Sequence, residues 1–104
     1  MLDCIFCEIA NKEAPGEIVY EDDKIIAFKD IKPLAPIHFL IIPKKHISSV
    51  DHVEIEDKTL MGDLIMAAQK IAREKKLNGY KLQINVGRPA GQIVDHLHLH
   101  LLAN

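Results

Sequence analysis

His96-Leu97-His98-Leu99-His100-Leu101-Leu102 alternates histidine with leucine close to the end of the chain. Alternate side chains of a β-strand lie on the same face of the sheet. The alternation therefore predicts a strand that carries three imidazoles on one face and points its leucines into a core. Imidazoles titrate near neutral pH, transfer protons, bind metals and attack phosphorus, so we expect this face to carry the chemistry of the protein.

Length and composition predict one small soluble globular domain that spans residues 1–104. Of the 104 residues, 48% are hydrophobic and 27% are charged, which is ordinary for a globular chain. The net charge of −2, the lack of a basic run and an aromatic content of 5% argue against nucleic acid as a partner. The sequence shows neither a signal peptide nor an apolar run of membrane-spanning length, so we expect no membrane partner and a cytoplasmic location.

The hydrophobic periodicity predicts an α+β fold in which a mainly antiparallel sheet of about five strands packs with one long helix. The long helix is expected over residues 56–76, with Asn78-Gly79 as its C-terminal stop. Its apolar stripe consists of Leu60, Leu64, Ala67, Ala68 and Ile71. A strand over residues 38–42, ended by Pro43, is too uniformly apolar to be exposed on both faces. A short helix is expected over residues 4–11, and further strands over residues 17–21, 24–29, 80–86 and the histidine stretch.

Two cysteines, Cys4 and Cys7, lie three positions apart near the start of the chain. In a cytosolic chain this spacing is typical of a metal site or a redox pair, and the lack of a preceding strand favours the metal. A tetrahedral zinc ion needs two further ligands, which His46 and one histidine of the stretch can supply. The alternative is one catalytic zinc held by all three imidazoles of the stretch, but these spread over about 13 Å at a rise of about 3.3 Å per residue. The structural zinc site is therefore easier to build.

A glycine-containing loop over residues 87–92 lies shortly before the histidine stretch. Backbone N–H groups in such a turn can form an anion-binding nest, which would hold a phosphate near the imidazoles. A neutral imidazole can attack phosphorus and form a covalent intermediate that water later hydrolyses. His98 has a histidine on each side to orient it and to stabilise charge on the phosphoryl oxygens, so it is the best candidate nucleophile. His38 begins another strand and is a candidate orienting partner of His100.

The stretch from His96 to Leu102 matches in full the signature His-φ-His-φ-His-φ-φ, where φ is hydrophobic. Further matching segments, in the same order and spacing, are residues 4–9, 20–23, 27–31, 36–47 and 91–94. On these residues the chain resembles the histidine triad (HIT) family over nearly its whole length. It is most similar to the Hint-like branch, the purine nucleoside phosphoramidases that are also described as protein kinase C inhibitor-like proteins.

The resemblance implies a HIT-like fold and a homodimer whose protomers join in one continuous antiparallel sheet. It implies that a purine nucleoside 5′-monophosphate or phosphoramidate binds in a cleft beside the histidines. It also implies that the P–N bond of adenosine 5′-phosphoramidates is hydrolysed through a nucleotidyl-histidine intermediate. A structural zinc ion is expected, and no organic cofactor is expected.

The resemblance also implies roles for individual residues. His98 would be the nucleophile, and His100 and His38 would form hydrogen bonds around the phosphate and the nucleophile. Asp30 would bind the ribose hydroxyls, which suits a carboxylate acceptor. The base would be enclosed by Phe28, Ile31 and Leu40, the phosphate and its loop would be flanked by Asn85, Gly91 and Gln92, and the zinc would be bound by Cys4, Cys7, His46 and His96.

Ile93 departs from the vertebrate members of that branch, which carry a serine that contacts the phosphate and the leaving group. Isoleucine donates no hydrogen bond, so protonation of the leaving group must differ or be slower. Other functions stay open: a non-catalytic nucleotide-binding or interaction module, a dinucleoside polyphosphate hydrolase from another branch, and a zinc-storage or redox module. The sequence identifies neither the physiological substrate nor a preference between adenine and guanine.

Overall fold

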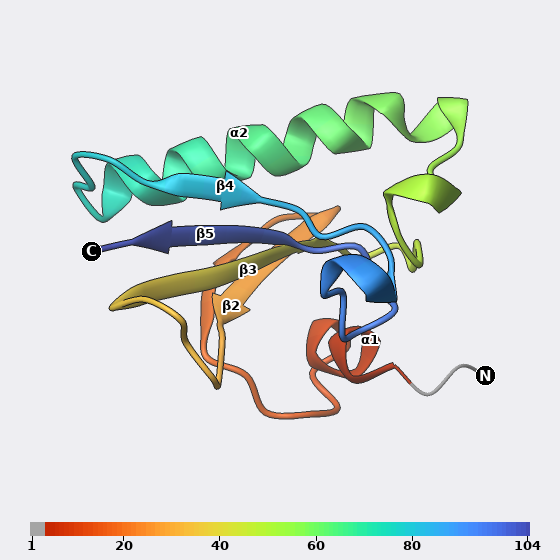
Figure 1. Cartoon of the computed structure of the whole chain (residues 1–104), viewed down its shortest axis with the longest axis horizontal. Helices are drawn as coiled ribbons and strands as arrows, with labels where there is room; N and C mark the ends of the chain where they lie inside the picture. The colour runs from red at the N-terminus through yellow and green to blue at the C-terminus, as the bar shows by residue number, and fades with distance from the viewer. Residues whose placement is uncertain (1–3) are drawn as a thin grey trace.

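The computed structural model describes residues 4–104, and within them the strands form one sheet in the order β1-β2-β3-β5-β4, with every neighbouring pair antiparallel (Figure 1). The strands are β1 Ile18–Glu21, β2 Ile25–Lys29, β3 Ile37–Pro43, β4 Lys81–Gln83 and β5 Leu99–Ala103. The helices are α1 Ile5–Ala10 and α2 Lys58–Glu74, and the 3-10 turns are η1 Val50–His52, η2 Ile55–Asp57 and η3 Arg88–Ala90. The predicted α+β fold, with its antiparallel sheet, one long helix and a short N-terminal helix, is confirmed. No helix among residues 4–104 is both long enough and apolar enough to cross a membrane.

The two helices lie on opposite faces of the sheet because its central strands are apolar on both faces (Figure 1). Ile25 and Ala27 pack with α2, whereas Ile26 and Phe28, which alternate with them along β2, pack with α1. The strand β3 shows the same alternation, so the predicted burial of this strand is confirmed. The core under α2 also contains the predicted stripe and the leucines of the histidine stretch, namely Leu64, Ala67, Ala68, Ile71, Leu97, Leu99 and Leu101, with Leu60 partly buried against it.

The long helix α2 is shorter than predicted at both ends. Residues 55–57 form the turn η2 instead of its first helical turn. At the other end, Lys76 N–H bonds to the Arg73 carbonyl and Leu77 N–H bonds to the Ala72 carbonyl, with Lys76 at a φ of 57°. These two bonds form a Schellman motif, in which glycine usually takes the left-handed position. The predicted stop at Asn78-Gly79 is therefore wrong: Lys76 takes that position, and the packing of Leu77 against the core accompanies it.

The histidine stretch is only partly a strand, because β5 begins after His98. His100 lies in the ladder with β3, whereas His96 and His98 precede it. Ahead of β5 the backbone leaves the ladder, and Leu97 N–H bonds to the carbonyl of Ile47 in the segment that follows β3. The prediction of three imidazoles on one face of one strand is therefore wrong.

Two other strand boundaries also differ from the prediction. The strand expected over residues 80–86 is reduced to β4, an exposed strand at the edge of the sheet. The predicted end of the apolar strand before Pro43 is wrong by one residue, since Pro43 pairs with Ile25 as the last residue of β3. A proline is tolerated there because its missing N–H falls where the ladder stops.

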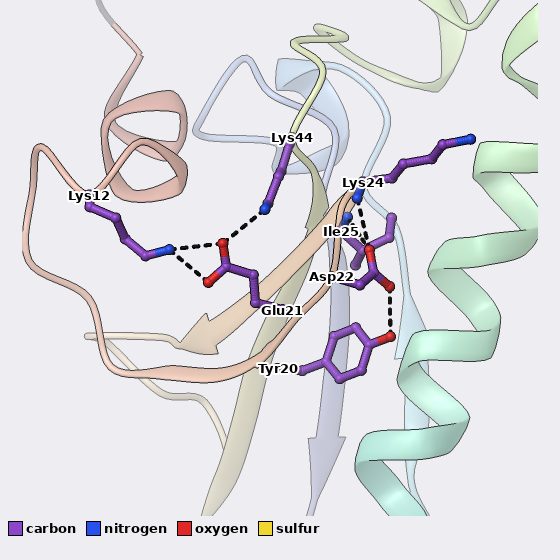
Figure 2. A network of polar contacts seen from close by, with 7 residues as sticks. All are labelled: Lys12, Tyr20, Glu21, Asp22, Lys24, Ile25 and Lys44. Atoms are coloured by element: carbon purple, nitrogen blue, oxygen red, sulfur yellow. Dashed lines mark hydrogen bonds and ion pairs between the residues drawn. The ribbon is translucent and has the colours of Figure 1, made fainter.

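A polar network ties the end of α1 to the hairpin formed by β1 and β2 (Figure 2). Lys12 Nζ donates to both carboxylate oxygens of Glu21 at 2.7 and 2.8 Å, and Lys44 Nζ lies 2.8 Å from the same carboxylate. In the turn, Asp22 accepts two backbone N–H groups and the hydroxyl of Tyr20, and that hydroxyl bond raises the pKa of Tyr20 to about 12. Surface ion pairs contribute at most about 1 kcal/mol each, so the network orients α1 more than it stabilises the fold.

Candidate functional site

The histidines of the sequence stretch divide between two polar clusters. The rings of His98 and His100 lie 4.9 Å apart between centroids, and the ring of His38 lies 5.1 Å from that of His100. His96 instead faces the two cysteines and His46. We call Asp30, His38, His98 and His100 the imidazole cluster, and we call Cys4, Cys7, His46 and His96 the thiol cluster.

The hydrogen bonds of His98 determine which ring nitrogen carries the proton. Its Nδ1 lies 2.7 Å from the backbone carbonyl of His96, and a carbonyl can only accept, so Nδ1 donates and Nε2 keeps a free lone pair. Burial lowers the pKa of His98, which keeps the ring neutral. The edge of the Phe6 ring packs against it at a centroid distance of 5.1 Å. His98 thus has the tautomer of a nucleophile that attacks through Nε2.

A chain of hydrogen bonds fixes the protons of His38 and His100 in the same way. Leu34 N–H donates to His38 Nδ1 at 3.0 Å, so the proton of the His38 ring lies on Nε2. That Nε2 donates to His100 Nδ1 at 2.9 Å, which places the His100 proton on its own Nε2. Burial, followed by the neighbouring His98 and His38, lowers the pKa of His100 to about 4, so the ring is neutral.

Among the buried side-chain nitrogen and oxygen atoms of residues 4–104, His100 Nε2 is left without a hydrogen-bond partner. Leaving a buried donor unsatisfied costs about 1–3 kcal/mol, so such a group calls for an explanation. A phosphoryl oxygen placed next to His98 Nε2 would accept this N–H. The imidazole cluster therefore combines one lone pair and one free donor on adjacent rings.

Asp30 follows the end of β2 and reaches the same place. Its Oδ1 accepts the N–H of Lys32, and its Oδ2 lies 3.4 Å from His38 Nε2. Its own N–H bonds to the carbonyl of His38, which fixes the backbone beside β3. The side chain of Asp30 is 20% exposed. The structure thus brings this predicted ribose ligand to the imidazole cluster.

The predicted base-enclosing residues are not all brought together. Phe28 and Leu40 are buried on the sheet face under α1, where Phe28 packs edge-on against Phe6 at 5.3 Å. Ile31 is 90% exposed in the loop after β2 and makes no enclosed wall with them. A hollow of about 560 Å³ lies beside His100 and is lined by Leu34, Ala35, Tyr80, Gln83 and Asn85 among others.

The glycine loop does not offer the predicted anion nest. Gly87 and Gly91 take positive φ values of 86° and 97°, and the N–H groups of Ala90, Gly91 and Gln92 bond to carbonyls of the loop itself. The buried side chain of Gln92 accepts the N–H of Gly87 and donates to two further backbone carbonyls. Asn85 Nδ2 lies 3.5 Å from the carbonyl of Gly91. These contacts brace the loop beside the histidines.

The thiol cluster has the dimensions of a tetrahedral metal site. Cys7 Sγ lies 3.3 Å from His46 Nδ1, and His96 Nδ1 lies 3.4 Å from Cys4 Sγ, 3.5 Å from Cys7 Sγ and 3.2 Å from His46 Nδ1. Metal–ligand distances of about 2.3 Å for sulfur and about 2.0 Å for nitrogen give tetrahedral edges of about 3.3 Å between two nitrogens and about 3.5 Å between sulfur and nitrogen. The predicted ligands are thus assembled, and a zinc-class ion fits between them.

The proton positions of the thiol cluster also suit a cation. His96 Nε2 donates to the carbonyl of Pro43 at 2.8 Å, which leaves the lone pair of Nδ1 directed at the thiols. Burial, and then the neighbouring Cys4 thiol, raise the pKa of Cys7 to about 11. A bound cation would remove this cost by stabilising the thiolates. The residues present therefore fit a structural zinc ion.

The same test argues against a metal in the imidazole cluster. Asp30, His38 and His100 also bring their ligand atoms within 4.8 Å of one another. A metal on His38 Nε2 would move the ring proton to Nδ1, where Leu34 N–H already points. Two donors would then face each other in a buried place, so this cluster suits proton-mediated contacts instead.

Three groups at the site were not identified from the sequence. The carbonyl of Pro43 and the N–H of Leu34 are backbone groups, and the type of residue does not indicate that they bind a histidine ring. Phe6 lies between the two cysteines on α1 and contacts the rings of both His96 and His98. Its position between Cys4 and Cys7 in the sequence could have indicated that it lies close to the metal ligands.

Comparison with known proteins supports this description. Residues 3–104 match the family model described as "Scavenger mRNA decapping enzyme C-term binding". Protein HitA of Neisseria gonorrhoeae is 46% identical over 103 residues, which cover 98% of this chain and 96% of HitA.

Solved structures agree in fold as well as in sequence. A HIT family hydrolase from Legionella pneumophila Philadelphia 1 superposes with a TM-score of 0.95 at 46% identity, over 98% of this chain and 93% of that one. A histidine triad protein from Clostridium difficile superposes with a TM-score of 0.96 at 42% identity, over 100% of this chain and 92% of that one. Fold and site together define a small α+β protein built around a histidine cluster. This chain belongs to the histidine triad (HIT) family.

Proposed function

We propose that this chain is a hydrolase that cleaves the P–N bond of purine nucleoside 5′-phosphoramidates through a nucleotidyl intermediate on His98. The observation that carries the proposal is the 2.7 Å hydrogen bond from His98 Nδ1 to the His96 carbonyl, which leaves a neutral ring with a free lone pair at Nε2. Attack by a neutral imidazole through Nε2 needs this tautomer. The similarity to a Legionella protein named as a HIT family hydrolase supports the assignment to hydrolases.

The reaction proceeds in two displacements. His98 Nε2 attacks phosphorus, the P–N bond of the substrate breaks, and the amine leaves after its nitrogen has taken a proton from solvent. The positive charge on the His98 ring is stabilised through the Nδ1–H bond to the His96 carbonyl, and His100 Nε2–H donates to the charged phosphoryl oxygen. Water then attacks phosphorus, the bond to His98 breaks, and the nucleoside monophosphate is released as the ring becomes neutral again.

The nucleotide would bind across the imidazole cluster. Asp30 keeps a carboxylate oxygen free of backbone bonds for the ribose hydroxyls. The apolar residues Phe28 and Leu40 provide one side for the base, with Ile31 in the adjacent loop. Gly91, Gln92 and Asn85 set the position of the loop beside the phosphate.

We also propose a homodimer that pairs through the edge strand β4. The outer edge of β4 has no strand partner within residues 4–104, and Tyr80 and Leu82 are 40% and 37% exposed beside it. An exposed edge with apolar neighbours is a template for pairing with a second chain. A structural zinc ion in the thiol cluster completes the proposal.

The test is hydrolysis of adenosine 5′-phosphoramidate, followed by release of AMP. We expect the wild-type protein to turn over, and we expect His98→Ala to lose on the order of 1000-fold or more in kcat, as enzymes do when they lose a nucleophile. His52→Ala is the matched control, because His52 is an exposed histidine outside both clusters. A nucleotidyl-histidine trapped on the wild type and missing from His98→Ala would identify the intermediate.

A second candidate is a nucleotide-binding module without catalysis, which Ile93 favours. The side chain of Ile93 is 80% exposed beside the loop and carries no donor for the leaving group. Binding of AMP without turnover of any phosphoramidate would support this candidate and contradict the first. Turnover of dinucleoside polyphosphates but not of phosphoramidates would instead assign the chain to the other hydrolase class.

A further inference from the structure

His96 takes part in both clusters. Its ring is fully buried, with Nδ1 directed at Cys4 and Cys7 and Nε2 bonded to the carbonyl of Pro43. Its backbone carbonyl accepts the bond from His98 Nδ1 that fixes the tautomer of the nucleophile. The side chain of His96 thus belongs to the thiol cluster, whereas its backbone carbonyl orients the ring of His98.

A second connection runs through Phe6. This residue lies between the two cysteines. Its ring centroid lies 5.1 Å from that of His98, with the two rings perpendicular, and 6.0 Å from that of His96. Cys4 also begins the helix, because its Sγ accepts the N–H of Cys7 at 3.3 Å. The sulfur of Cys4 thus holds the turn that places Phe6 against His98.

Regular secondary structure contributes little to fixing these two segments, although Leu97 and Leu99 on either side of His98 are buried in the core. His98 precedes the ladder of β5, so no strand pairing sets its position. The helix α1 has six residues, and isolated helices of that length are not stable in water. Its placement depends on packing, on the Lys12–Glu21 ion pair and on the thiol cluster.

We propose that the thiol cluster positions the nucleophile: a zinc-class divalent ion held by Cys4, Cys7, His46 and His96 keeps the His96 carbonyl and the Phe6 ring where they orient His98. His96 is then a positioning residue for the reaction. This inference rests on the proposed function for its kinetic consequence, whereas its structural consequence can be observed without any substrate.

Loss of the ion leaves the lone pair of His96 Nδ1 facing two protonated thiols and His46. The bond from Nε2 to the Pro43 carbonyl remains, but the side of the ring that faces the thiols loses its strongest partner. The segment that carries the His96 carbonyl is then held by fewer contacts, and His98 has a less fixed acceptor for Nδ1–H. The ring of His98 then populates both tautomers, and only one of them presents a lone pair at Nε2.

The experiment compares zinc-reconstituted protein with protein stripped by a chelator, using the full chain throughout. The first readout is the ¹⁵N NMR spectrum of histidine-labelled protein, in which His98→Gln assigns the signals of His98. We expect the Nδ1-protonated tautomer with zinc and a mixture of tautomers without it. The second readout is single-turnover hydrolysis of adenosine 5′-phosphoramidate, which we expect to slow by about 10- to 100-fold, the usual effect of losing an outer orienting partner. The Kd of AMP should change by less than about threefold, since ground-state binding is not affected.

Matched variants separate positioning from general damage. Cys7→Ser should behave like the stripped wild type, and a chelator should slow it no further. Cys7→His retains a metal ligand and should recover zinc binding, the single tautomer and most of the rate. His52→Ala should respond to zinc and chelator as the wild type does, because His52 lies outside the cluster.

Two results would overturn the inference. One is a stripped protein that remains folded and keeps the single His98 tautomer. The other is a stripped protein that hydrolyses the substrate at the rate of the zinc-loaded form. Failure of the zinc-loaded wild type to hydrolyse any phosphoramidate would instead contradict the proposed function, and the NMR comparison would still test the positioning of His98.

Discussion

The thiol cluster and the imidazole cluster use the same residue type in opposite ways. In the thiol cluster, His96 donates outward to a carbonyl, so its lone pair faces inward toward three other ligands. In the imidazole cluster, His38 accepts from a backbone N–H, so its proton faces inward toward His100. The thiol cluster therefore directs lone pairs at a common centre, as a cation requires, whereas the imidazole cluster directs a proton inward.

The difference shows that the backbone partner of an imidazole, more than its neighbours along the chain, determines its role. Pro43 supplies a carbonyl and Leu34 supplies an N–H, and each choice fixes a tautomer. His96 and His98 are two residues apart, yet His96 keeps its lone pair on Nδ1, facing the thiols, and His98 keeps its lone pair on Nε2.

The largest expected effect is the stabilisation of the protein by zinc. At a free zinc concentration about 1000-fold above Kd, the ion should raise the free energy of unfolding of stripped wild type by about 4 kcal/mol. The combined variant Cys4→Ser and Cys7→Ser should show no such increase, because the thiolate ligands are gone. Thermal unfolding with and without zinc measures this effect.

The number of zinc ions bound per chain also distinguishes the thiol cluster from the imidazole cluster. We expect one ion per chain in the wild type and one ion per chain in His38→Ala, since the imidazole cluster holds a proton and no metal. A second ion in the wild type that His38→Ala removes would show that the tautomer argument for His38 is wrong.

The next effect is the dependence of stability on pH. The pKa of His100 is lowered from 6.5 to about 4, first by burial and then by His98 and His38. Between these values the unfolded chain binds more protons, so the free energy of unfolding is highest above pH 6.5 and falls as the pH decreases toward 4. After allowance for the partial solvent contact of His100, its share of the loss is about 2 kcal/mol.

Urea unfolding of wild type and His100→Gln at about pH 7 and about pH 4.5 measures how much His100 contributes to the loss of stability at acidic pH. The wild type should lose more stability than the variant between these two conditions. An equal loss in both proteins would show that the protonation of His100 is not coupled to folding.

The smallest expected effect is on ribose recognition. Asp30→Asn should weaken AMP binding by about tenfold, which corresponds to about 1.4 kcal/mol for hydrogen bonds to a charged acceptor. The variant should bind 2′-deoxy-AMP about as well as AMP, whereas the wild type should prefer AMP. Isothermal titration calorimetry measures the Kd of both nucleotides. If Asp30→Asn still prefers AMP over 2′-deoxy-AMP as the wild type does, Asp30 is not the ribose ligand.

Much of the fold was accessible from the sequence because burial leaves a periodic pattern. The stripe of α2 and the alternating leucines of the histidine stretch predicted which faces are buried, and both predictions are confirmed. The ends of the helices and strands were harder to predict from the sequence. The stop of α2 depends on the left-handed Lys76, and the start of β5 depends on a bond from Leu97 to Ile47, neither of which a local pattern contains.

For the candidate site, the sequence by itself predicted the residues that assemble in the two clusters, including the two cysteines and the histidines, because cysteine and histidine are scarce elsewhere in the chain. It did not determine which nitrogen of each ring carries a proton. The strand pattern placed His96 on one face with His98 and His100, whereas the family resemblance assigned it to the zinc ligands, which is the cluster where it lies. The proton positions depend on backbone groups of Pro43, Leu34 and His96 that reach the rings only in the folded chain. Only the tertiary structure decided them, because a hydrogen bond to the backbone depends on position in space and leaves no trace in residue type.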